Sequence, residues 1–290
     1  MSSKISIIGA GGRMGDWFVR YLLNNNYKNL NLYDTNTKSI FQYPYVTINN
    51  NLKDCVSDSD MVILCVPLIH LPKLVIQCKK FMKSSSIIIE ISSLKSPVIR
   101  SLMTLPRHIQ PISIHPMFGS GADLKSKLKI LLIPIRNKTK EKRFTKKIFP
   151  NSRILLVGDY KEHDQLMSII LGLTHYVNIV FGDFLSEKKC NILNSYSGTT
   201  FRIQKLLINS IFADDPELIS TLIMDNVYVK REIKKFNKYF DKYNKIIFRN
   251  EKDSLKTELI RTKSSMKKYR DFDNSYRQLY EFVNNIKDTS

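Results

Sequence analysis

The stretch "KISIIGAGGRMG" (residues 4–15) joins a short apolar run to a cluster of glycines. Gly9, Gly12 and Gly15 have the spacing G-x-x-G-x-x-G, a one-residue variant of the loop between the first strand and first helix of dinucleotide-binding domains. Such glycines permit a tight turn and let the backbone approach a pyrophosphate, which the helix N-terminus stabilises. The stretch therefore predicts a nucleotide-binding turn at the start of an α/β domain.

An acidic residue supports this interpretation and indicates the cofactor. Asp34 follows Gly15 by 19 residues, at the end of the next predicted strand. A carboxylate there accepts both ribose hydroxyls of NAD and repels the additional phosphate of NADP, although Asp34 could instead be a turn residue in "YDTN". We therefore expect NAD as the cofactor. The expected contacts are Gly9, Ala10, Gly12, Arg13, Met14, Gly15, Asp34, Val66 and Pro67.

Apolar runs recur along the first half of the chain, with helical segments between several of them. They occupy residues 4–8, 30–33, 61–66, 86–91, 110–114, 129–135 and 153–157. Continuous runs such as "MVILCV" (61–66) are typical of parallel strands that are buried on both faces. We predict a Rossmann-type, doubly wound parallel sheet over residues 1–158.

The pattern becomes helical after Gly158. From Lys161 to Leu185 the apolar residues recur at helical spacing and predict one long helix with a strong apolar face. In "ADDPEL" (213–218), Asp215 is a predicted helix cap, with Pro216 at the first helical position. We assign residues 159–290 to an all-helical domain that binds substrate and forms a homodimer.

Composition excludes several classes of protein. The net charge of +20 is compatible with a nucleic-acid partner, but we favour a lysine-rich solvated surface because no arginine–aromatic platform for single strands is present. No run of about 18 apolar residues predicts a membrane span. The four cysteines lack metal-binding spacing, and the N-terminal "MSSKISIIGAGG" lacks signal-peptide features. We expect no metal, no nucleic acid, no membrane and a reducing, cytoplasmic location.

Several segments, taken in order, resemble the prephenate dehydrogenase family. They are "GAGGRMGDWF" (9–18), "EISSLKS" (90–96), "HPMFG" (115–119), "EHD" (162–164) with "LTH" (173–175), and "FRIQKLL" (201–207) with "FADDPEL" (212–218). The resemblance extends from residue 4 to about residue 225. It implies oxidative decarboxylation of prephenate to 4-hydroxyphenylpyruvate with reduction of NAD, a step of tyrosine biosynthesis.

The resemblance also implies roles for individual side chains. His115 matches the family's catalytic histidine, a base that takes the hydroxyl proton as hydride leaves; otherwise it is a loop histidine. Ser93 is expected to bind the substrate hydroxyl or to hold His115 in one tautomer, unless it is only a helix cap. Arg202 matches the arginine that faces the ring carboxylate, and His175 a histidine near the pyruvyl group, unless His175 is a core residue.

Other residues in the matched segments have more than one interpretation. His163 lies twelve residues before His175, about 18 Å along a helix, so the two cannot touch one small substrate. We interpret His163 as a helix-start residue or one that acts behind the contact residues. Lys95 and Arg13 are alternative cations for a substrate carboxylate. Glu90 stands where the family usually has aspartate, and its role stays open.

Two other functions remain compatible with the sequence. One is arogenate dehydrogenase, or another NAD(P)-dependent dehydrogenase of similar architecture; no residue distinguishes prephenate from arogenate. The other is a nucleotide-binding regulatory protein with a basic surface. His115, Ser93 and Arg202 favour an enzyme, because a sensor needs no acid–base pair. The sequence indicates nothing about feedback inhibition by tyrosine.

Overall fold

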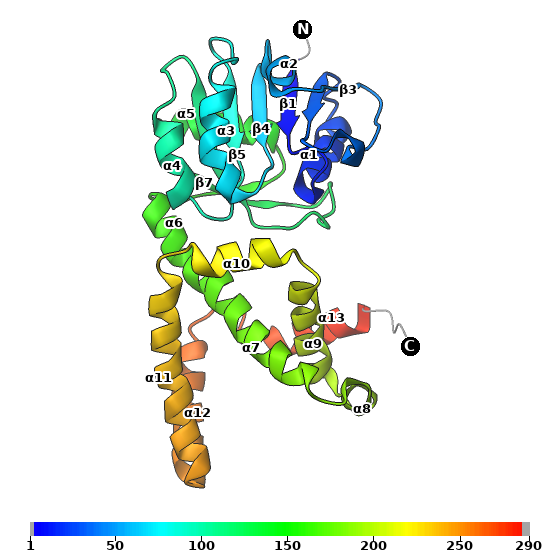
Figure 1. Cartoon of the computed structure of the whole chain (residues 1–290). Coiled ribbons are helices and arrows are strands. Elements are labelled where there is room, and N and C mark those ends of the chain that lie inside the picture. The colour runs from blue at the N-terminus through cyan, green and yellow to red at the C-terminus, as the bar shows by residue number, and fades with distance from the viewer. Residues whose placement is uncertain (1–2, 286–290) are drawn as a thin grey trace. The chain divides into compact units, whose positions relative to one another are not determined.

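The computed structural model describes residues 3–285 and contains two compact units, Met1–Met167 and Ser168–Ser290 (Figure 1). The first unit is an α/β domain and the second is helical. The division lies inside the long helix that begins at Tyr160, and not before it as we expected, because the first turns of this helix contact the α/β unit.

The α/β unit is built on an eight-stranded sheet with the strand order β3-β2-β1-β4-β5-β6-β7-β8. Its strands are β1 (Ile5–Ile8), β2 (Leu30–Tyr33), β3 (Val46–Ile48), β4 (Met61–Leu64), β5 (Ile87–Glu90), β6 (Gln110–Pro116), β7 (Lys129–Ile133) and β8 (Arg153–Leu156). The first six strands are parallel and have the doubly wound order, which confirms the predicted fold class. The order reverses between β1 and β4, where such sheets bind ligands beyond their carboxyl ends.

The predicted all-parallel sheet needs one correction. Strand β7 runs antiparallel to β6 and parallel to β8. A parallel neighbour requires a crossover connection, usually a helix, to return the chain to the opposite edge. Residues 117–128 contain no helix, so the chain turns back at the carboxyl end of β6 and enters β7 in the opposite direction.

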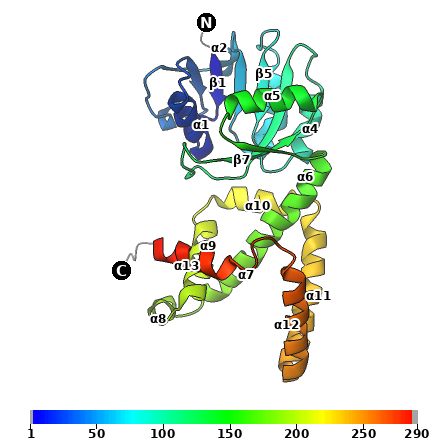
Figure 2. The same ribbon diagram turned by 180° about the vertical axis from the view of Figure 1, so that it is seen from behind.

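Helices cover both faces of the sheet (Figures 1 and 2). One face carries α1 (Arg13–Asn24) and α5 (Lys138–Ile148); the other carries α2 (Leu52–Val56), α3 (Leu71–Cys78) and α4 (Ser96–Met103). Strand β4 shows why its sequence is continuously apolar. Met61 and Ile63 pack in the core under α1 and α5, whereas Val62 and Leu64 pack in the core on the opposite face of the sheet.

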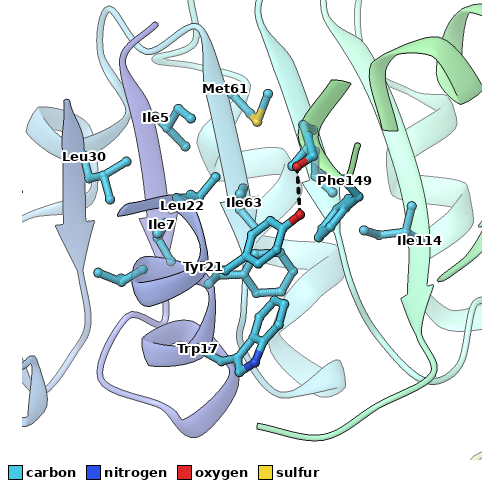
Figure 3. Close-up of a cluster of buried hydrophobic side chains, with 14 of the residues drawn as sticks. Ile5, Ile7, Trp17, Tyr21, Leu22, Leu30, Met61, Ile63, Ile114 and Phe149 are labelled. Carbon is cyan, nitrogen blue, oxygen red and sulfur yellow. Dashed lines mark hydrogen bonds between the residues drawn. The ribbon is translucent and has the colours of Figure 1, made fainter. Parts of the chain in front are cut away.

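An aromatic group holds the helix after the glycine loop against the sheet. Trp17 is stacked on Tyr21 with a centroid separation of 4.9 Å, and Tyr21 is stacked on Phe149 at 5.2 Å; the three side chains are drawn in Figure 3. The Tyr21 hydroxyl donates to the Ile148 carbonyl at 3.2 Å. These contacts join α1 to the end of α5 and so fix the helix N-terminus that begins beside the glycines.

The predicted long helix is continuous but not uniform. It consists of α6 (Tyr160–Met167), a π-helical segment (Ser168–Leu173) and α7 (Thr174–Ser186). Within the second unit, α11 packs directly on the π-helical backbone, since a Cβ at Gly172 would lie 2.3 Å from Val229 Cγ2. Neither the π segment nor this close approach was predicted from apolar spacing.

The remaining helices belong to the second unit. They are α8 (Cys190–Ser195), α9 (Thr199–Phe212), α10 (Pro216–Met224), α11 (Val229–Phe248), α12 (Lys252–Met266) and α13 (Ser275–Asn285). The predicted cap is confirmed, because the Asp215 carboxylate accepts from the backbone N–H of Glu217 at 2.9 Å. Helices α11 and α12 form a hairpin, and α9 packs on α7.

Candidate active site

The glycine loop has the geometry of a nucleotide-binding turn. Gly9 has a φ of +83°, and a Cβ there would lie 2.3 Å from the Cys65 carbonyl oxygen. A Cβ at Gly15 would lie 2.0 Å from the Gly9 carbonyl oxygen. These two glycines are therefore required by the turn itself and by the close packing of α1 on β1.

Gly12 differs from these two glycines, and the difference indicates where a ligand fits. It caps α1, and a Cβ there would meet only carbonyl oxygens, the nearer at 3.4 Å. No protein contact accounts for a glycine at this exposed position, whereas a pyrophosphate on the helix N-terminus would need the open space. The loop therefore fits a dinucleotide.

The other predicted cofactor contacts lie around this loop. The Asp34 carboxylate accepts from the backbone N–H of Gly11 at 3.0 Å, which places it at the end of β2 beside the glycines. Val66 follows β4, and its Cγ1 would touch a Cβ on Gly9. The structure thus places the set at the carboxyl ends of β1, β2 and β4. The remaining members occupy the turn (Ala10), the first turn of α1 (Arg13 and Met14) and the residue after Val66 (Pro67).

His115 stands at the carboxyl end of the same sheet, as the penultimate residue of β6, and is almost fully buried. Its Nδ1 lies 3.0 Å from Nε2 of His163. Nδ1 of His163 lies 2.8 Å from Oδ1 of Asp164. A chain of three side chains therefore runs from the start of α6 to the end of β6, all within the α/β unit.

The charges in this chain determine which atom can accept a proton. Burial, the Lys95 cation and His163 hold the pKa of His115 well below its usual value, and burial also lowers the pKa of His163. Burial acts to raise the pKa of Asp164, but its hydrogen bonds from His163, Ser96 and two backbone N–H groups hold it below the usual value. At neutral pH both histidines are neutral and Asp164 is ionised.

The tautomers follow from these states. An ionised carboxylate only accepts, so His163 donates from Nδ1 and its Nε2 must accept. His115 then donates from Nδ1, and its Nε2 retains a lone pair. The arrangement leaves a general base at His115 Nε2, as expected for a catalytic histidine.

Asp164 also caps α4. Its carboxylate accepts from the backbone N–H groups of Lys95, at 2.9 Å, and Ser96, at 2.8 Å, and from the Ser96 hydroxyl. The N-cap residue of α4 is Lys95, which corrects the alternative interpretation of Ser93 as the cap. Two orphan donors at the helix N-terminus thus position the carboxylate that orients His163.

Ser93 does not hold His115 in one tautomer, which was one of its two predicted roles. It is half-buried, and its hydroxyl has no hydrogen-bond partner between residues 3 and 285. His163, not Ser93, occupies His115 Nδ1 and fixes the tautomer. The other expected role of Ser93, binding the substrate hydroxyl, stays a prediction.

Lys95 is excluded as a cation for substrate. Its side chain is completely buried, and its Nζ lies 2.7 Å from Oε1 of Glu90, which is also completely buried. The suggestion that Lys95 could hold a substrate carboxylate is therefore wrong, because the ammonium is enclosed and already paired. Glu90, whose role was open, is its partner.

His175 and Arg202 lie in the helical unit, on α7 and α9. Nδ1 of half-buried His175 donates to the Leu171 carbonyl at 2.7 Å, which leaves Nε2 available. Arg202 is exposed in the first turn of α9. Asn178 and Gln204 are joined by a hydrogen bond of 2.7 Å between the two helices, a few residues beyond each predicted contact. His175 and Arg202 thus lie on neighbouring helices.

Comparison with known proteins identifies the family. A family model described as the nucleotide-binding domain of prephenate dehydrogenase matches residues 20–134, and one described as its dimerization domain matches residues 159–261. The chain belongs to the prephenate dehydrogenase family. The first match begins after the glycine loop, so the loop and the family match are separate observations.

Two curated relatives support the assignment to this family. A probable arogenate/prephenate dehydrogenase of Methanocaldococcus jannaschii is 25% identical over 78% of this chain and 52% of its own length. A T-protein of Enterobacter agglomerans is 27% identical over 81% of this chain and 60% of its own. The chain thus spans only about half to three-fifths of the length of these relatives.

Solved structures have the same fold at lower identity. Prephenate dehydrogenase from A. aeolicus, solved in complex with hydroxyphenyl propionate and NAD+, superposes with a TM-score of 0.73 over 92% of this chain and 98% of its own, at 19% identity. Synechocystis arogenate dehydrogenase gives a TM-score of 0.67 over 92% and 99%, at 15% identity. These likenesses show that the chain has the same fold as these two proteins.

His163 and Asp164 are more closely linked to His115 than their sequence positions predicted. The helical distance of about 18 Å correctly separated His163 from His175, but it said nothing of contacts with another strand. The adjacent pair "HD" at a helix start contained the missing signal. Two polar residues at the first turn can contact another element, and here Asp164 caps a helix some 68 residues away in sequence.

Proposed function

We propose that this protein catalyses the oxidative decarboxylation of prephenate to 4-hydroxyphenylpyruvate with reduction of NAD, a step of tyrosine biosynthesis. The observation that carries the proposal is the chain Asp164–His163–His115, which ends in a proton-accepting Nε2. It lies in the same α/β unit as a glycine loop that fits a dinucleotide. A base and a nucleotide site at one sheet edge are what this reaction requires.

His115 performs the proton transfer in this proposal. NAD, when bound, supplies the hydride acceptor. As hydride leaves the ring carbon that carries the hydroxyl, His115 Nε2 takes the hydroxyl proton. Loss of the ring carboxylate as CO2 then makes the ring aromatic, and the electron pair of the broken bond leaves a phenolate oxygen, which regains the proton from His115 to give 4-hydroxyphenylpyruvate. The imidazolium formed donates through Nδ1 to His163, and the Asp164 carboxylate stabilises the resulting charge. General-base help of this kind is worth roughly 10²–10⁴-fold.

Substrate binding is assigned to the helical unit. Prephenate carries two carboxylates, and the planar fork of Arg202 suits a bidentate bond to the ring carboxylate. His175 Nε2 is available for the pyruvyl group. We assign binding of the substrate hydroxyl to Ser93. Asp34 favours NAD over NADP, because its carboxylate at the end of β2 would repel a 2′-phosphate.

The assembly and location follow from the same features. We propose a homodimer formed through the helical unit, which the matched dimerization domain supports. Cys55, Cys65 and Cys78 are free thiols, and burial raises the pKa of the Cys55 and Cys78 thiols to about 12. The unpaired state of these three cysteines supports a reducing compartment, which we propose is the cytoplasm.

A specific observation favours arogenate as the second candidate substrate. The Methanocaldococcus jannaschii relative is named for both substrates, and a structure of similar fold is an arogenate dehydrogenase. Arogenate differs from prephenate only by an amine in place of the keto oxygen. The ring chemistry at His115 is the same for both.

A steady-state assay tests the proposal. Purified protein is mixed with prephenate or arogenate and with NAD or NADP, and the absorbance of the reduced cofactor is followed. We expect the fastest turnover with prephenate and NAD, and its loss in His115→Asn. Faster turnover of arogenate would reassign the substrate. Cofactor binding without turnover of either substrate would favour the regulatory alternative.

A further inference from the structure

A buried ion pair contacts the residue before His115 and is not used by the mechanism above. Lys95 and Glu90 are both completely buried, and their Nζ and Oε1 atoms are 2.7 Å apart. Burial lowers the pKa of Lys95, and the Glu90 carboxylate opposes that effect. Two charges enclosed without solvent are costly to bury, so the fold needs a reason to retain them.

The contacts of Glu90 show that the pair does not bind a ligand. Its Oε1 accepts from Lys95 Nζ and from the Ser113 hydroxyl, and its Oε2 accepts from the backbone N–H and the hydroxyl of Ser92, at 2.8 and 2.6 Å. In the part of the chain that the structure describes, no buried side-chain polar atom lacks a partner. The network is closed, so it can act only through its neighbours.

Lys95 contacts each element that delivers the histidine chain. Its Nζ donates to the Ile114 carbonyl at 2.7 Å, which belongs to the peptide bond that leads into His115. Its backbone N–H donates to Asp164 Oδ1 at 2.9 Å, the oxygen that also faces His163. One residue therefore joins the ends of β5 and β6 to the start of α6.

The Lys95 ammonium also acts on His115 through its positive charge. The charged and titratable groups around that imidazole are Lys95 at the N-cap of α4, His163 and Asp164 on α6, and Glu90 at the end of β5. A fixed positive charge in a low-dielectric interior opposes a second positive charge on His115. The cation thus favours the form of His115 that accepts a proton.

We propose that Lys95 is a positioning residue: its ammonium, held by Glu90, fixes the end of β6 against α6 and maintains His115 as a neutral base. The inference rests on the proposed function for its catalytic meaning, but its structural content is independent of any substrate. It requires that the charge of Lys95, and not only its volume, affects His115.

The test separates the effect of the Lys95 charge from the effect of its side-chain volume. Lys95→Met leaves the Glu90 charge buried without a partner and can prevent folding, so the decisive variant is Lys95→Met combined with Glu90→Gln, which removes both charges at similar volume. Glu141→Gln is the matched control. Glu141 is equally buried in the same unit, and it accepts from the backbone of residues 135–137 at the start of α5.

The first measurement is an NMR titration of isotope-labelled histidine side chains in the whole protein, assigned with His115→Asn. In the double variant we expect the midpoint of His115 to rise by about one pH unit or more, the size of effect expected for loss of a nearby like charge. The Glu141→Gln control should leave the midpoint unchanged. A midpoint that does not move in the folded double variant overturns the inference.

Kinetics provide the second measurement. The double variant should lower kcat and move the acidic limb of its pH profile upward, with the KM values and NAD affinity nearly unchanged. A shifted His115 titration without turnover of prephenate or arogenate in the wild type contradicts the proposed function and leaves the role of Lys95 standing. Wild-type turnover with an unshifted kcat profile in the variant contradicts the role of Lys95 alone.

Discussion

The protonation of His115 decides what the site can do. A solvated imidazole is about half protonated near pH 6.5, whereas burial, Lys95 and His163 hold the pKa of His115 well below that value. Because of this low pKa, His115 is a neutral base throughout the physiological pH range. The low pKa also weakens the base, and the Asp164 carboxylate behind His163 compensates as charge develops.

Substitution of His115 tests this role directly. We expect His115→Asn to lower kcat by roughly 10²–10⁴-fold with little change in KM, because a base acts mainly in the transition state. The wild-type kcat should fall only when the pH falls through the depressed pKa of His115, and the variant should lack this acidic limb. His108→Asn, at an exposed histidine of the same unit, is the control. Near-normal turnover of His115→Asn would reduce "HPMFG" to a structural turn.

The same histidines make the fold sensitive to mild acid. The pKa values of His115 and His163 are lowered on folding, so below about pH 6.5 the unfolded chain binds protons that the folded chain does not. The free energy of unfolding should therefore decrease from about pH 6.5 downward, by up to about 1.4 kcal/mol per pH unit for each histidine. Asp164, whose folded pKa is also lowered, acts only at lower pH, because its stabilisation is lost below the unfolded value of about 3.9.

Urea unfolding between pH 5 and 8 measures this dependence. The slope against pH should become smaller in His115→Asn and stay unchanged in His108→Asn. An unfolding free energy that is constant from pH 8 to pH 5 would show that the histidines are not buried as neutral groups.

At the scale of elements, the cofactor site depends on how β2 ends beside the glycine loop. Asp34 accepts from the backbone N–H of Gly11, and the proposed function also assigns this carboxylate to the ribose of the cofactor. The nearby α1 is fixed by the stacked Trp17, Tyr21 and Phe149. These contacts hold α1 and the loop in place, and such preorganisation lowers the entropic cost of binding a ligand.

Asp34→Ser tests the choice of cofactor. Calorimetry should show NAD bound more tightly than NADP by the wild type, and a narrower ratio in the variant, because the repulsion of the 2′-phosphate is removed. Both affinities can fall together, since Asp34 also holds the loop, so the ratio of the two dissociation constants is the decisive quantity. Equal affinities in the wild type would contradict the prediction.

The sequence predicted elements better than their connections. The periodicity of "MVILCV" and the cap at Asp215 depend on neighbours in the chain, and both are confirmed. The antiparallel β7, the three-residue β3 and the contact of His163 with His115 depend on long-range geometry. Glu90 and Lys95 show the same limit, because two charged residues in an apolar segment reveal their pairing only when strand and helix meet.

Helix α9 carries the prediction for substrate binding. Arg202→Gln should mainly raise the KM for prephenate, by roughly 10- to 150-fold, because an anchor acts in the ground state and transition state alike. Lys205→Gln removes a positive charge from the same helix and is the control; that ammonium bonds to Asn194 at 2.5 Å. Equal effects of the two variants would indicate general attraction of the substrate, and an unchanged KM in Arg202→Gln would assign the carboxylate to another cation.

At the scale of the whole molecule, the helical unit exposes apolar surface that a single chain does not cover. Val180 and Phe184 on α7, Phe212 on α9 and Val227 after α10 are each more than half exposed. The helix Tyr160–Ser186 is even long and apolar enough to span a membrane by length and composition. The match of residues 159–261 to a dimerization domain offers an explanation within the family: a second copy covers this surface.

We therefore expect a homodimer in solution, and light scattering at micromolar concentration should give about twice the chain mass of 33.8 kDa. Val180→Asp combined with Phe184→Asp places two carboxylates on the exposed face of α7 and should yield a monomer. Phe41→Asp, at an aromatic residue of the α/β unit that is also more than half exposed, should leave the dimer intact. Each copy carries a net charge of +20, so the two copies repel each other, and added salt should tighten the dimer by screening that repulsion. A wild-type monomer, or a dimer that the α7 substitutions do not disturb, would contradict the assignment of this face.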